Sequence, residues 1–270
     1  MLFQEAYKAE HSENRMKHEG DVARAREHFF SSESHNLRQL LKSRFSWMNR
    51  YISENGRGLE VGCGTGVSKE FIRAREYIVS DYAEHPWLDA CNVDALHTGF
   101  PDESFDFVVS SNMVHHVPYP VRFFDEMYRI LKPGGVLLIQ EINASFFMRT
   151  LLRLMRHEGY SFDVDVFDPQ VVCTDPEDLW SANCAIPNLL FDDAAKFHTQ
   201  VPQFQIVMQS YSEFFNFINS GGVIAKTFSI PLPVFLLKTI ELIDTCLANC
   251  APSVFALQRQ IVLKKVTTKK

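Results

Sequence analysis

The chain lacks the features that mark secreted proteins and proteins with a cysteine-based metal site. Met1 to Gly20 is polar and holds no apolar core like that of a signal peptide, so we expect the chain to stay in the cytoplasm. No pair among its six cysteines has zinc-finger or CxxC spacing, so we expect reduced thiols and no metal site. Cys246 and Cys250 lie four residues apart on a predicted helix, and this spacing fits either side-chain packing or metal binding by the two thiols.

Long apolar runs and an excess of positive charge are also missing. The stretch from Ile230 to Leu247 is interrupted by Lys238, Glu241 and Asp244, whereas a membrane span needs about 20 mostly apolar residues. We therefore predict no transmembrane segment. The sequence leaves undecided whether this stretch forms a helix that lies on a membrane or one that covers a substrate pocket. Lys and Arg number 27 against 33 Asp and Glu, which argues against nucleic acid as a substrate.

The composition is that of a globular protein that begins with helices. A length of 270 residues with 46% hydrophobic and 22% charged residues fits one α/β domain with a packed core. Between Asp21 and Ile52, apolar residues recur at helical spacing in two blocks, separated by Ser31, Ser32 and Ser34. This pattern predicts two helices before the first strand.

The next segment alternates between strand and helix patterns. Predicted strands cover Gly58–Val61, Tyr77–Ser80, Phe105–Ser110 and Val136–Ile142. Predicted helices cover Ser68–Arg75 and Pro120–Leu131, with a turn at Lys132–Gly135. Such alternation indicates a parallel sheet with helices on both faces.

The regular alternation ends after Asn143. We predict a helix over Phe146–Arg156, an irregular segment over Gly159–Lys196 and a helix over Pro233–Cys250. Phe204–Ser212 and Ala256–Lys265 are the best late strands, because they carry alternating or continuous β-branched residues.

The run Leu59–Gly66 brings three glycines to the end of the first predicted strand. Glycine permits unusual backbone dihedrals and lets a cofactor approach the main chain, although a tight turn without a ligand has the same composition. A dinucleotide fingerprint needs a small residue at the position that Val67 occupies, so a nicotinamide or flavin cofactor is disfavoured. Asp81 ends the second strand, where a carboxylate accepts ribose hydroxyls or simply caps a turn.

Together these motifs resemble the small-molecule class I methyltransferases that use S-adenosylmethionine (SAM). The resemblance covers about residues 57 to 143, a third of the chain, and the order of several motifs makes it specific. The motifs, in chain order, are Glu60–Gly66, Asp81, Asn92–Ala95, Phe100–Asp106, Asn112–Val117 and Leu131–Gly135.

The resemblance implies a fold and a cofactor site. The fold would be a Rossmann-like three-layer α/β/α sandwich with a mostly parallel seven-stranded sheet and an antiparallel last strand. The glycine run would hold the methionine end of SAM, Asp81 the ribose, and Asp94 with Ala95 the adenine, although Asp94 is also a common turn cap. The implied cofactor-binding residues are Glu60, Gly62, Cys63, Gly64, Gly66, Asp81, Tyr82, Asp94, Ala95 and Asn112.

Two adjacent histidines follow the third core strand, at the sheet edge where ligands bind in open α/β folds. In the family that this sequence resembles, this loop lies beside the transferred methyl group. His115 and His116 are therefore candidates for a general base, because imidazole takes up a proton near neutral pH. The alternative is that either one packs under the loop and hydrogen-bonds the backbone.

These observations divide the chain and predict its activity. We expect an N-terminal arm and helices that pack on the core over 1–56 and a SAM-binding Rossmann-like core over 57–143. The C-terminal half of the same domain, over 144–270, would carry lid and substrate-specificity insertions. The predicted function is SAM-dependent methylation of a small-molecule, glycan or lipid-linked acceptor, and an oxygen atom is the first choice for the methylated atom. The prediction is compatible with peripheral contact with a membrane. The alternative is a SAM-binding regulatory module with the same fold and no transfer activity.

Overall fold

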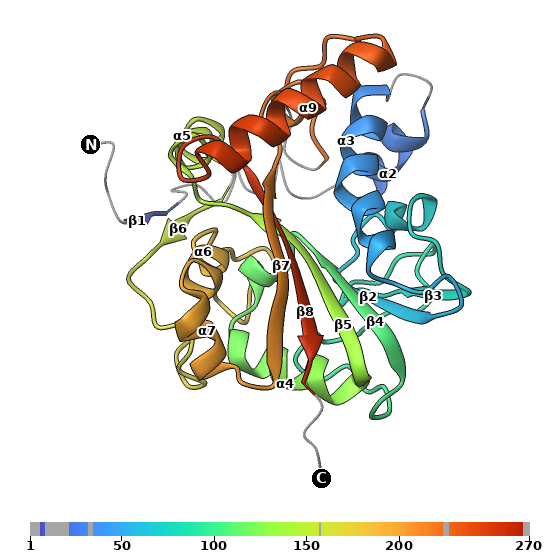
Figure 1. Cartoon of the computed structure of the whole chain (residues 1–270), viewed down its shortest axis with the longest axis vertical. Coiled ribbons are helices and arrows are strands. Elements are labelled where there is room, and N and C mark those ends of the chain that lie inside the picture. The colour runs from blue at the N-terminus through green and yellow to red at the C-terminus, as the bar shows by residue number, and fades with distance from the viewer. Residues whose placement is uncertain (1–5, 9–21, 32–34, 157, 224–226, 267–270) are drawn as a thin grey trace.

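The computed structural model describes residues 6–8, 22–31, 35–156, 158–223 and 227–266 (Figure 1). Most of the predicted N-terminal arm, together with Ser32 and Ser34 of the predicted helix break, lies outside these residues. Within the arm, Ala6–Tyr7 forms the short strand β1, which pairs with β6 (Tyr160–Ser161).

A six-stranded sheet forms the centre of the molecule. Its spatial order is β3-β2-β4-β5-β8-β7, and the first four of these strands are parallel. The last strand along the chain runs antiparallel to both of its neighbours, as predicted. The strand bounds are β2 (Arg57–Val61), β3 (Glu76–Val79), β4 (Phe105–Ser111), β5 (Leu131–Ile142), β7 (Phe204–Ser212) and β8 (Gln258–Lys265).

The prediction of seven strands in this sheet is wrong by one for the described residues. The segment between β3 and β4 makes two isolated bridges, a parallel one between Ser80 and Ala90 and an antiparallel one between Asp94 and His97, and otherwise continues as turns. Two aspartates of this segment satisfy backbone N–H groups: Asp89 accepts a hydrogen bond from that of Val79 at the end of β3, and Asp94 caps a turn by accepting one from that of Leu96. These local hydrogen bonds compete with a strand ladder.

The sheet is buried because its central strands carry apolar residues on both faces. Along β4, Val108 packs into one apolar cluster whereas Val109 packs into the other, as expected for side chains that alternate across a strand. Along β5, Leu137 and Leu138 divide between the two clusters in the same way. The core therefore consists of two apolar layers, one on each face of the sheet.

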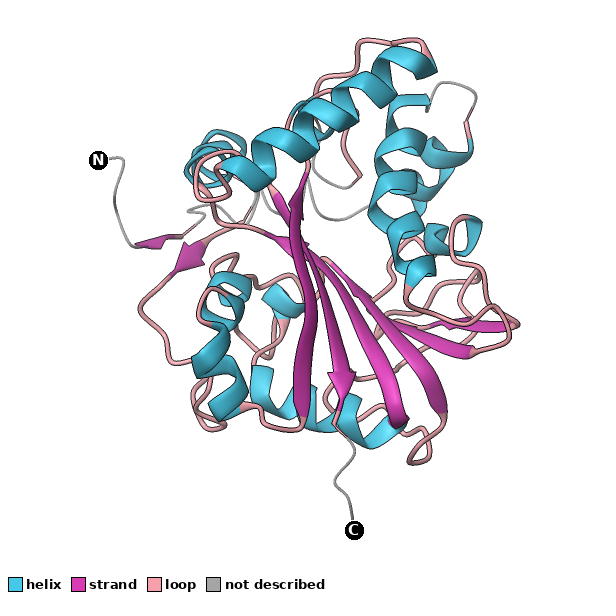
Figure 2. Cartoon of the chain, viewed as in Figure 1, coloured by secondary structure: helices cyan, strands magenta, loops and turns pink. Residues whose placement is uncertain are grey.

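Helices cover both layers (Figure 2). One face carries α4 (Pro120–Ile130), α6 (Ile186–Phe191) and α7 (Ala194–Gln200), whose phenylalanines enter the first cluster. The other face carries α2 (Val22–Phe30) and α3 (His35–Ser46), which confirms the two predicted N-terminal helices. The Rossmann-like three-layer arrangement is thus confirmed.

The C-terminal half also covers the end of the sheet at which the parallel strands finish (Figure 1). This layer contains α5 (Phe146–Met155), α8 (Phe215–Ile218) and α9 (Val234–Cys250). A buried bidentate ion pair, from Arg44 on α3 to Glu213 before α8, joins it to the N-terminal helices at 2.7 and 2.8 Å. None of the helices in the described residues combines the length and apolarity needed to cross a bilayer.

Some local predictions fail. The helix predicted over Ser68–Arg75 is only a short 3-10 helix, η2 (Val67–Glu70), and the predicted turn Lys132–Gly135 lies within β5, beside a register shift. The segment Gly159–Lys196 is also more regular than predicted, because it holds β6, α6 and the start of α7. Its prolines and carboxylates start helices there: Pro187 lies in the first turn of α6, and Asp193 caps α7 by accepting from the N–H of Lys196.

Candidate active site

The glycine run forms a bare main-chain turn between β2 and η2. Gly62, Gly64 and Gly66 have φ values of 66°, 50° and 62°, in the left-handed region that favours glycine. A Cβ on Gly62 would lie 2.3 Å from Cγ of Met113, so the close contact requires glycine. A Cβ on Gly64 would meet only Val22, at 3.9 Å, so this residue leaves space beside the turn.

Asp81 lies directly after β3 and holds the glycine turn. One carboxylate oxygen accepts the N–H of Gly64 at 2.7 Å, and the other accepts the N–H of Ala83 at 3.0 Å. The indole N–H of Trp87 donates to the carbonyl of Gly64 at 3.0 Å, so the turn is fixed from two sides. Each Asp81 oxygen keeps capacity for a further hydrogen bond, because an ionised carboxylate offers about four acceptor positions.

Glu60 lies under the turn at the end of β2. Its side chain is buried and accepts hydrogen bonds from the hydroxyls of Ser68 and Tyr77. Burial raises the pKa of Glu60 to about 7, and the two hydroxyl donors offset part of that effect. Burial, with Glu60 and Asp81 nearby, also raises the pKa of Cys63, so this residue is a neutral thiol rather than a thiolate.

Asp94 and Ala95 form a turn at the same edge. A carboxylate oxygen of Asp94 accepts the N–H of Leu96 at 2.8 Å, and its carbonyl accepts the N–H of His97 at 3.0 Å. The turn-capping role that the sequence left open for Asp94 is therefore present, on a residue that also faces a cavity.

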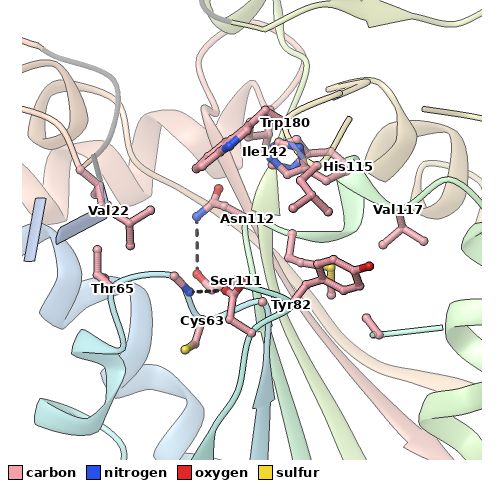
Figure 3. A pocket seen from close by; sticks show the side chains of 18 of the residues that line it. Val22, Cys63, Thr65, Tyr82, Ser111, Asn112, His115, Val117, Ile142 and Trp180 are labelled. Atoms are coloured by element: carbon pink, nitrogen blue, oxygen red, sulfur yellow. Dashed lines mark hydrogen bonds between the residues drawn. The ribbon is translucent and has the colours of Figure 1, made fainter. Parts of the chain in front are cut away.

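A cavity of about 770 Å³ opens at the carboxyl ends of the parallel strands. Its volume is within the range of about 300 to 1,000 Å³ typical of ligand sites. All the predicted site residues line it except Gly66, whose N–H closes the turn by donating to the carbonyl of Cys63 at 3.0 Å. Figure 3 shows Cys63 and Tyr82 on one side of Asn112, and His115 and Trp180 on the other.

Asn112 is held in a strained conformation by a chain of buried amides. Its φ of 51° is uncommon outside glycine, and its side-chain oxygen accepts from Gln258 at 2.9 Å. Gln258 accepts in turn from Gln140 at 3.2 Å, and Gln140 accepts from the indole of Trp47 at 3.1 Å. The Asn112 side chain, which lines the cavity, is therefore held by a chain of hydrogen bonds that begins at Trp47.

His115 is clamped by a buried carboxylate. Its Nδ1 lies 2.7 Å from an oxygen of Glu141, whose other oxygen accepts the N–H groups of Met113 and Val114 at 2.7 and 2.6 Å. Burial disfavours the imidazolium, but the carboxylates of Glu141 and Glu158 outweigh burial and raise the pKa of His115 to about 10.

His116 has the opposite electrostatic environment. Burial and the neighbouring His115 lower the pKa of His116 to about 4. Its Nδ1 lies 3.0 Å from the carbonyl oxygen of Ser181, and because a carbonyl only accepts, Nδ1 carries the proton. The backbone contact that the sequence offered as an alternative is therefore present, and Nε2 of His116 keeps its lone pair.

Glu158 completes this end of the cavity. Its carboxylate oxygens lie 3.5 Å from Nε2 of His115 and 3.7 Å from Nε2 of His116. The thiol of Cys184 donates to Glu158 at 3.2 Å. We call His115, His116 and Glu158 the histidine cluster.

Sequence reasoning missed two carboxylates of this site. Glu141 ends the predicted strand Val136–Ile142, so the rule that singled out the histidines also applied to it. Glu158 follows a helix in a segment without periodicity, and no local pattern marked it.

Comparisons with known proteins match the same part of the chain. A family model described as a methyltransferase domain matches residues 29–160. Over 104 residues the chain is 36% identical to the phosphatidylethanolamine N-methyltransferase of Cereibacter sphaeroides, covering 32% of this chain and 51% of that protein. Over 130 residues it is 31% identical to a ubiquinone biosynthesis O-methyltransferase of Pseudomonas putida, covering 42% and 56%. The matched segments thus span about half the length of these relatives.

Solved structures extend the likeness to the fold. A SAM-dependent methyltransferase from Archaeoglobus fulgidus superposes with a TM-score of 0.51 at 18% identity, covering 84% of this chain and 94% of that chain. A methyltransferase from Bacillus halodurans gives a TM-score of 0.50 at 16% identity, covering 84% and 99%. At this level of identity the likeness concerns the fold alone.

Proposed function

We propose that the chain is a class I SAM-dependent methyltransferase, which binds SAM at the glycine turn and methylates a small-molecule, glycan or lipid-linked acceptor. The matching methyltransferase-domain model and the methyltransferase relatives support this proposal. The observation that carries this proposal is the cavity beside Gly62 and Gly64, with Asp81 at its edge. The missing Cβ of Gly64 leaves room there for a ligand against the main chain, so the residues present fit the cofactor.

The cofactor contacts divide among three turns. We assign the methionine end of SAM to the main chain at Gly62–Gly66 above Glu60 and Cys63, and the ribose to the carboxylate of Asp81. We assign the adenine ring to Asp94 and Ala95. Tyr82 and Asn112 are assigned further contacts along the cofactor.

Bound SAM supplies a methyl group on a positively charged sulfur, which leaves as a neutral thioether. The protein has to align the acceptor with that methyl group and exclude water, because displacement in line needs little covalent help. The apolar cavity wall from α5, which includes Met148, Leu151 and Leu152, serves the second purpose.

The histidine cluster lies at the acceptor end in this proposal. Nε2 of His116 keeps a lone pair, so it is the nitrogen placed to accept a hydrogen bond from an acceptor hydroxyl, and its lowered pKa of about 4 makes it a weak base for removing that proton. His115 is held by Glu141 and positions the loop. Both nitrogen and oxygen atoms can accept a methyl group from SAM. The polar histidine cluster favours an oxygen as the acceptor atom.

The acceptor is proposed to have an apolar part. Leu179, Phe217 and Val223 line the cavity from the C-terminal half, and exposed apolar residues such as Phe235 and Leu242 lie on α9. We propose that residues 144–270 form the lid and specificity half around the core at 57–143, with helices from 1–56 packed on it. Peripheral contact with a membrane through α9 is part of this proposal.

Calorimetry with SAM on the full chain and two variants tests the cofactor site. Asp81→Asn should weaken SAM binding by about 1.5 to 3 kcal/mol, because a neutral amide replaces a charged acceptor. Asp102→Asn is the matched control, since Asp102 precedes β4 at the opposite edge of the sheet and pairs with Arg129 on the surface. Equal affinity in the two variants would remove Asp81 from the site.

Turnover is tested separately, by mass spectrometry of candidate acceptors incubated with the protein and SAM. Gain of one methyl group supports the enzyme. SAM binding with no methyl transfer to any hydroxyl, amine or carboxylate acceptor would favour the regulatory module instead.

A further inference from the structure

We propose that Nε2 of His115, Nε2 of His116 and the carboxylate of Glu158 bind a divalent transition-metal ion such as Zn²⁺, with one coordination position open to the cavity. One ligand atom from each residue lies within 4.8 Å of the other two. The inference departs from the expectation that the chain has no metal site, and its role in catalysis rests on the proposed function.

The distances between the histidines and Glu158 are compatible with coordination of a shared ion. Nε2 of His115 and of His116 lie 3.5 and 3.7 Å from Glu158 oxygens, beyond the 2.7 to 3.2 Å usual for N–H···O hydrogen bonds. Around a tetrahedral zinc with bonds of about 2.0 to 2.1 Å, ligand atoms lie roughly 3.3 to 3.4 Å apart. The two nitrogen-to-oxygen distances exceed this spacing by a few tenths of an ångström, to different oxygens of Glu158, and the three ligand atoms lie within 4.8 Å of one another, so side-chain movements of up to about 1.5 Å would gather them around an ion.

The outer hydrogen bonds match those of metal-binding histidines. A metal-binding imidazole usually donates its other ring N–H to a carboxylate or a backbone carbonyl. Nδ1 of His115 faces Glu141 at 2.7 Å, and Nδ1 of His116 faces the carbonyl of Ser181 at 3.0 Å. Both rings are thus fixed with Nε2 directed toward Glu158, and the Cys184 thiol orients that carboxylate. Metal binding displaces the Nε2 proton of the His115 imidazolium, which is released to water.

Two histidines and one carboxylate make an incomplete coordination sphere. Sites with three such ligands leave a position for water or substrate, as in catalytic zinc sites. All three cluster residues line the cavity, beside Tyr119 and Trp180. The open position therefore lies where the proposed function places the acceptor.

A metal here would define the acceptor as one that binds through a hydroxyl oxygen. Coordination lowers the pKa of the hydroxyl, so its proton passes to water. The oxygen lone pair then forms the bond to the methyl carbon, while the carbon–sulfur bond breaks and its electron pair stays on sulfur. His116 would act as a ligand in this case, and the metal would replace it in activating the hydroxyl.

Cys246 and Cys250 are the competing place for a metal. Both thiols are exposed on α9, with sulfur atoms 4.0 Å apart. They supply two ligands rather than three, and neither cysteine lines the cavity. The double variant Cys246→Ser/Cys250→Ser is therefore the starting protein for the test.

Zn²⁺ titration of the metal-free protein by calorimetry, with elemental analysis after dialysis, tests the proposal. The starting protein should bind one equivalent, and Glu158→Gln and His116→Ala should each weaken binding by about 100-fold or more. Glu141→Gln, which alters the outer hydrogen bond to Nδ1 of His115 and neutralises the carboxylate that holds the N–H groups of Met113 and Val114, should weaken it by about 10 to 100-fold. His198→Ala removes an exposed histidine on α7 and should leave binding unchanged.

The outcomes separate the metal site from the proposed function. Undiminished Zn²⁺ binding in folded Glu158→Gln, or no binding once the two thiols are removed, would overturn the metal site. Full methyl transfer by metal-free protein in a chelator would overturn the activating role. SAM titration of the metal-free protein reports on the cofactor site alone, so failure there contradicts the proposed function and leaves the metal result standing.

Discussion

Replacement of Glu60 by Gln should remove a pH dependence from the stability of the protein. Glu60 is 1% exposed and accepts hydrogen bonds from Ser68 and Tyr77, yet burial raises its pKa from 4.5 to about 7. Between these two pH values the folded protein holds a proton that the unfolded chain has released. The free energy of unfolding therefore falls as pH rises through this window.

The size of this effect follows from the shift. A difference of about 2.5 pKa units at 1.36 kcal/mol each gives roughly 3 kcal/mol. Glutamine does not titrate and still offers an oxygen to the two hydroxyls. The free energy of unfolding of Glu60→Gln, relative to wild type, should therefore rise by about 3 kcal/mol between pH 4.5 and pH 8.

Urea unfolding without SAM, at intervals from pH 5 to pH 8, measures this difference. Glu70→Gln removes an exposed carboxylate from the end of η2 and serves as the control for net charge. Its pH profile should run parallel to that of wild type. A constant difference between Glu60→Gln and wild type over this range would show that the buried carboxyl is not protonated, and would refute the reasoning.

Two further predictions concern the ion pair between layers and the glycine turn. Arg44→Met should lower the free energy of unfolding in urea by about 3 to 5 kcal/mol, because it leaves the buried carboxylate of Glu213 without its ion-pair partner. The double variant Arg44→Met/Glu213→Leu should lose much less stability, and equal losses in the two proteins would contradict this prediction. Gly62→Ala should weaken SAM binding in calorimetry at least tenfold, because its Cβ would meet Met113. Gly99→Ala, with φ of 74° and open space, should not; similar affinities would count against the close contact.

The central sheet was predictable because its residues carry their own signal. Phe105–Ser111 and Val136–Ile142 are apolar on both faces, which only a strand between two helical layers requires. Gly62 and Asp81 come at the ends of such strands, so topology brings them to one edge. The order of motifs along the chain then identified the cofactor.

The acceptor end was less accessible because long-range contacts build it. Glu158 reaches the histidines from beyond α5, and Ser181 from a loop further along the chain. Neither segment has a periodicity that fixes its position. Gln258 lies on a strand that the sequence predicted, but only the pairing of that strand with β5 brings its amide to Asn112.

The structure of the chain in complex with S-adenosylhomocysteine, the demethylated cofactor, tests the central claim most directly. We expect this ligand in the cavity, with its amino-acid end on the main chain at Gly62–Gly66 and its ribose hydroxyls on the carboxylate of Asp81. A ligand bound elsewhere, or a cavity that stays empty at saturating concentration, would contradict it.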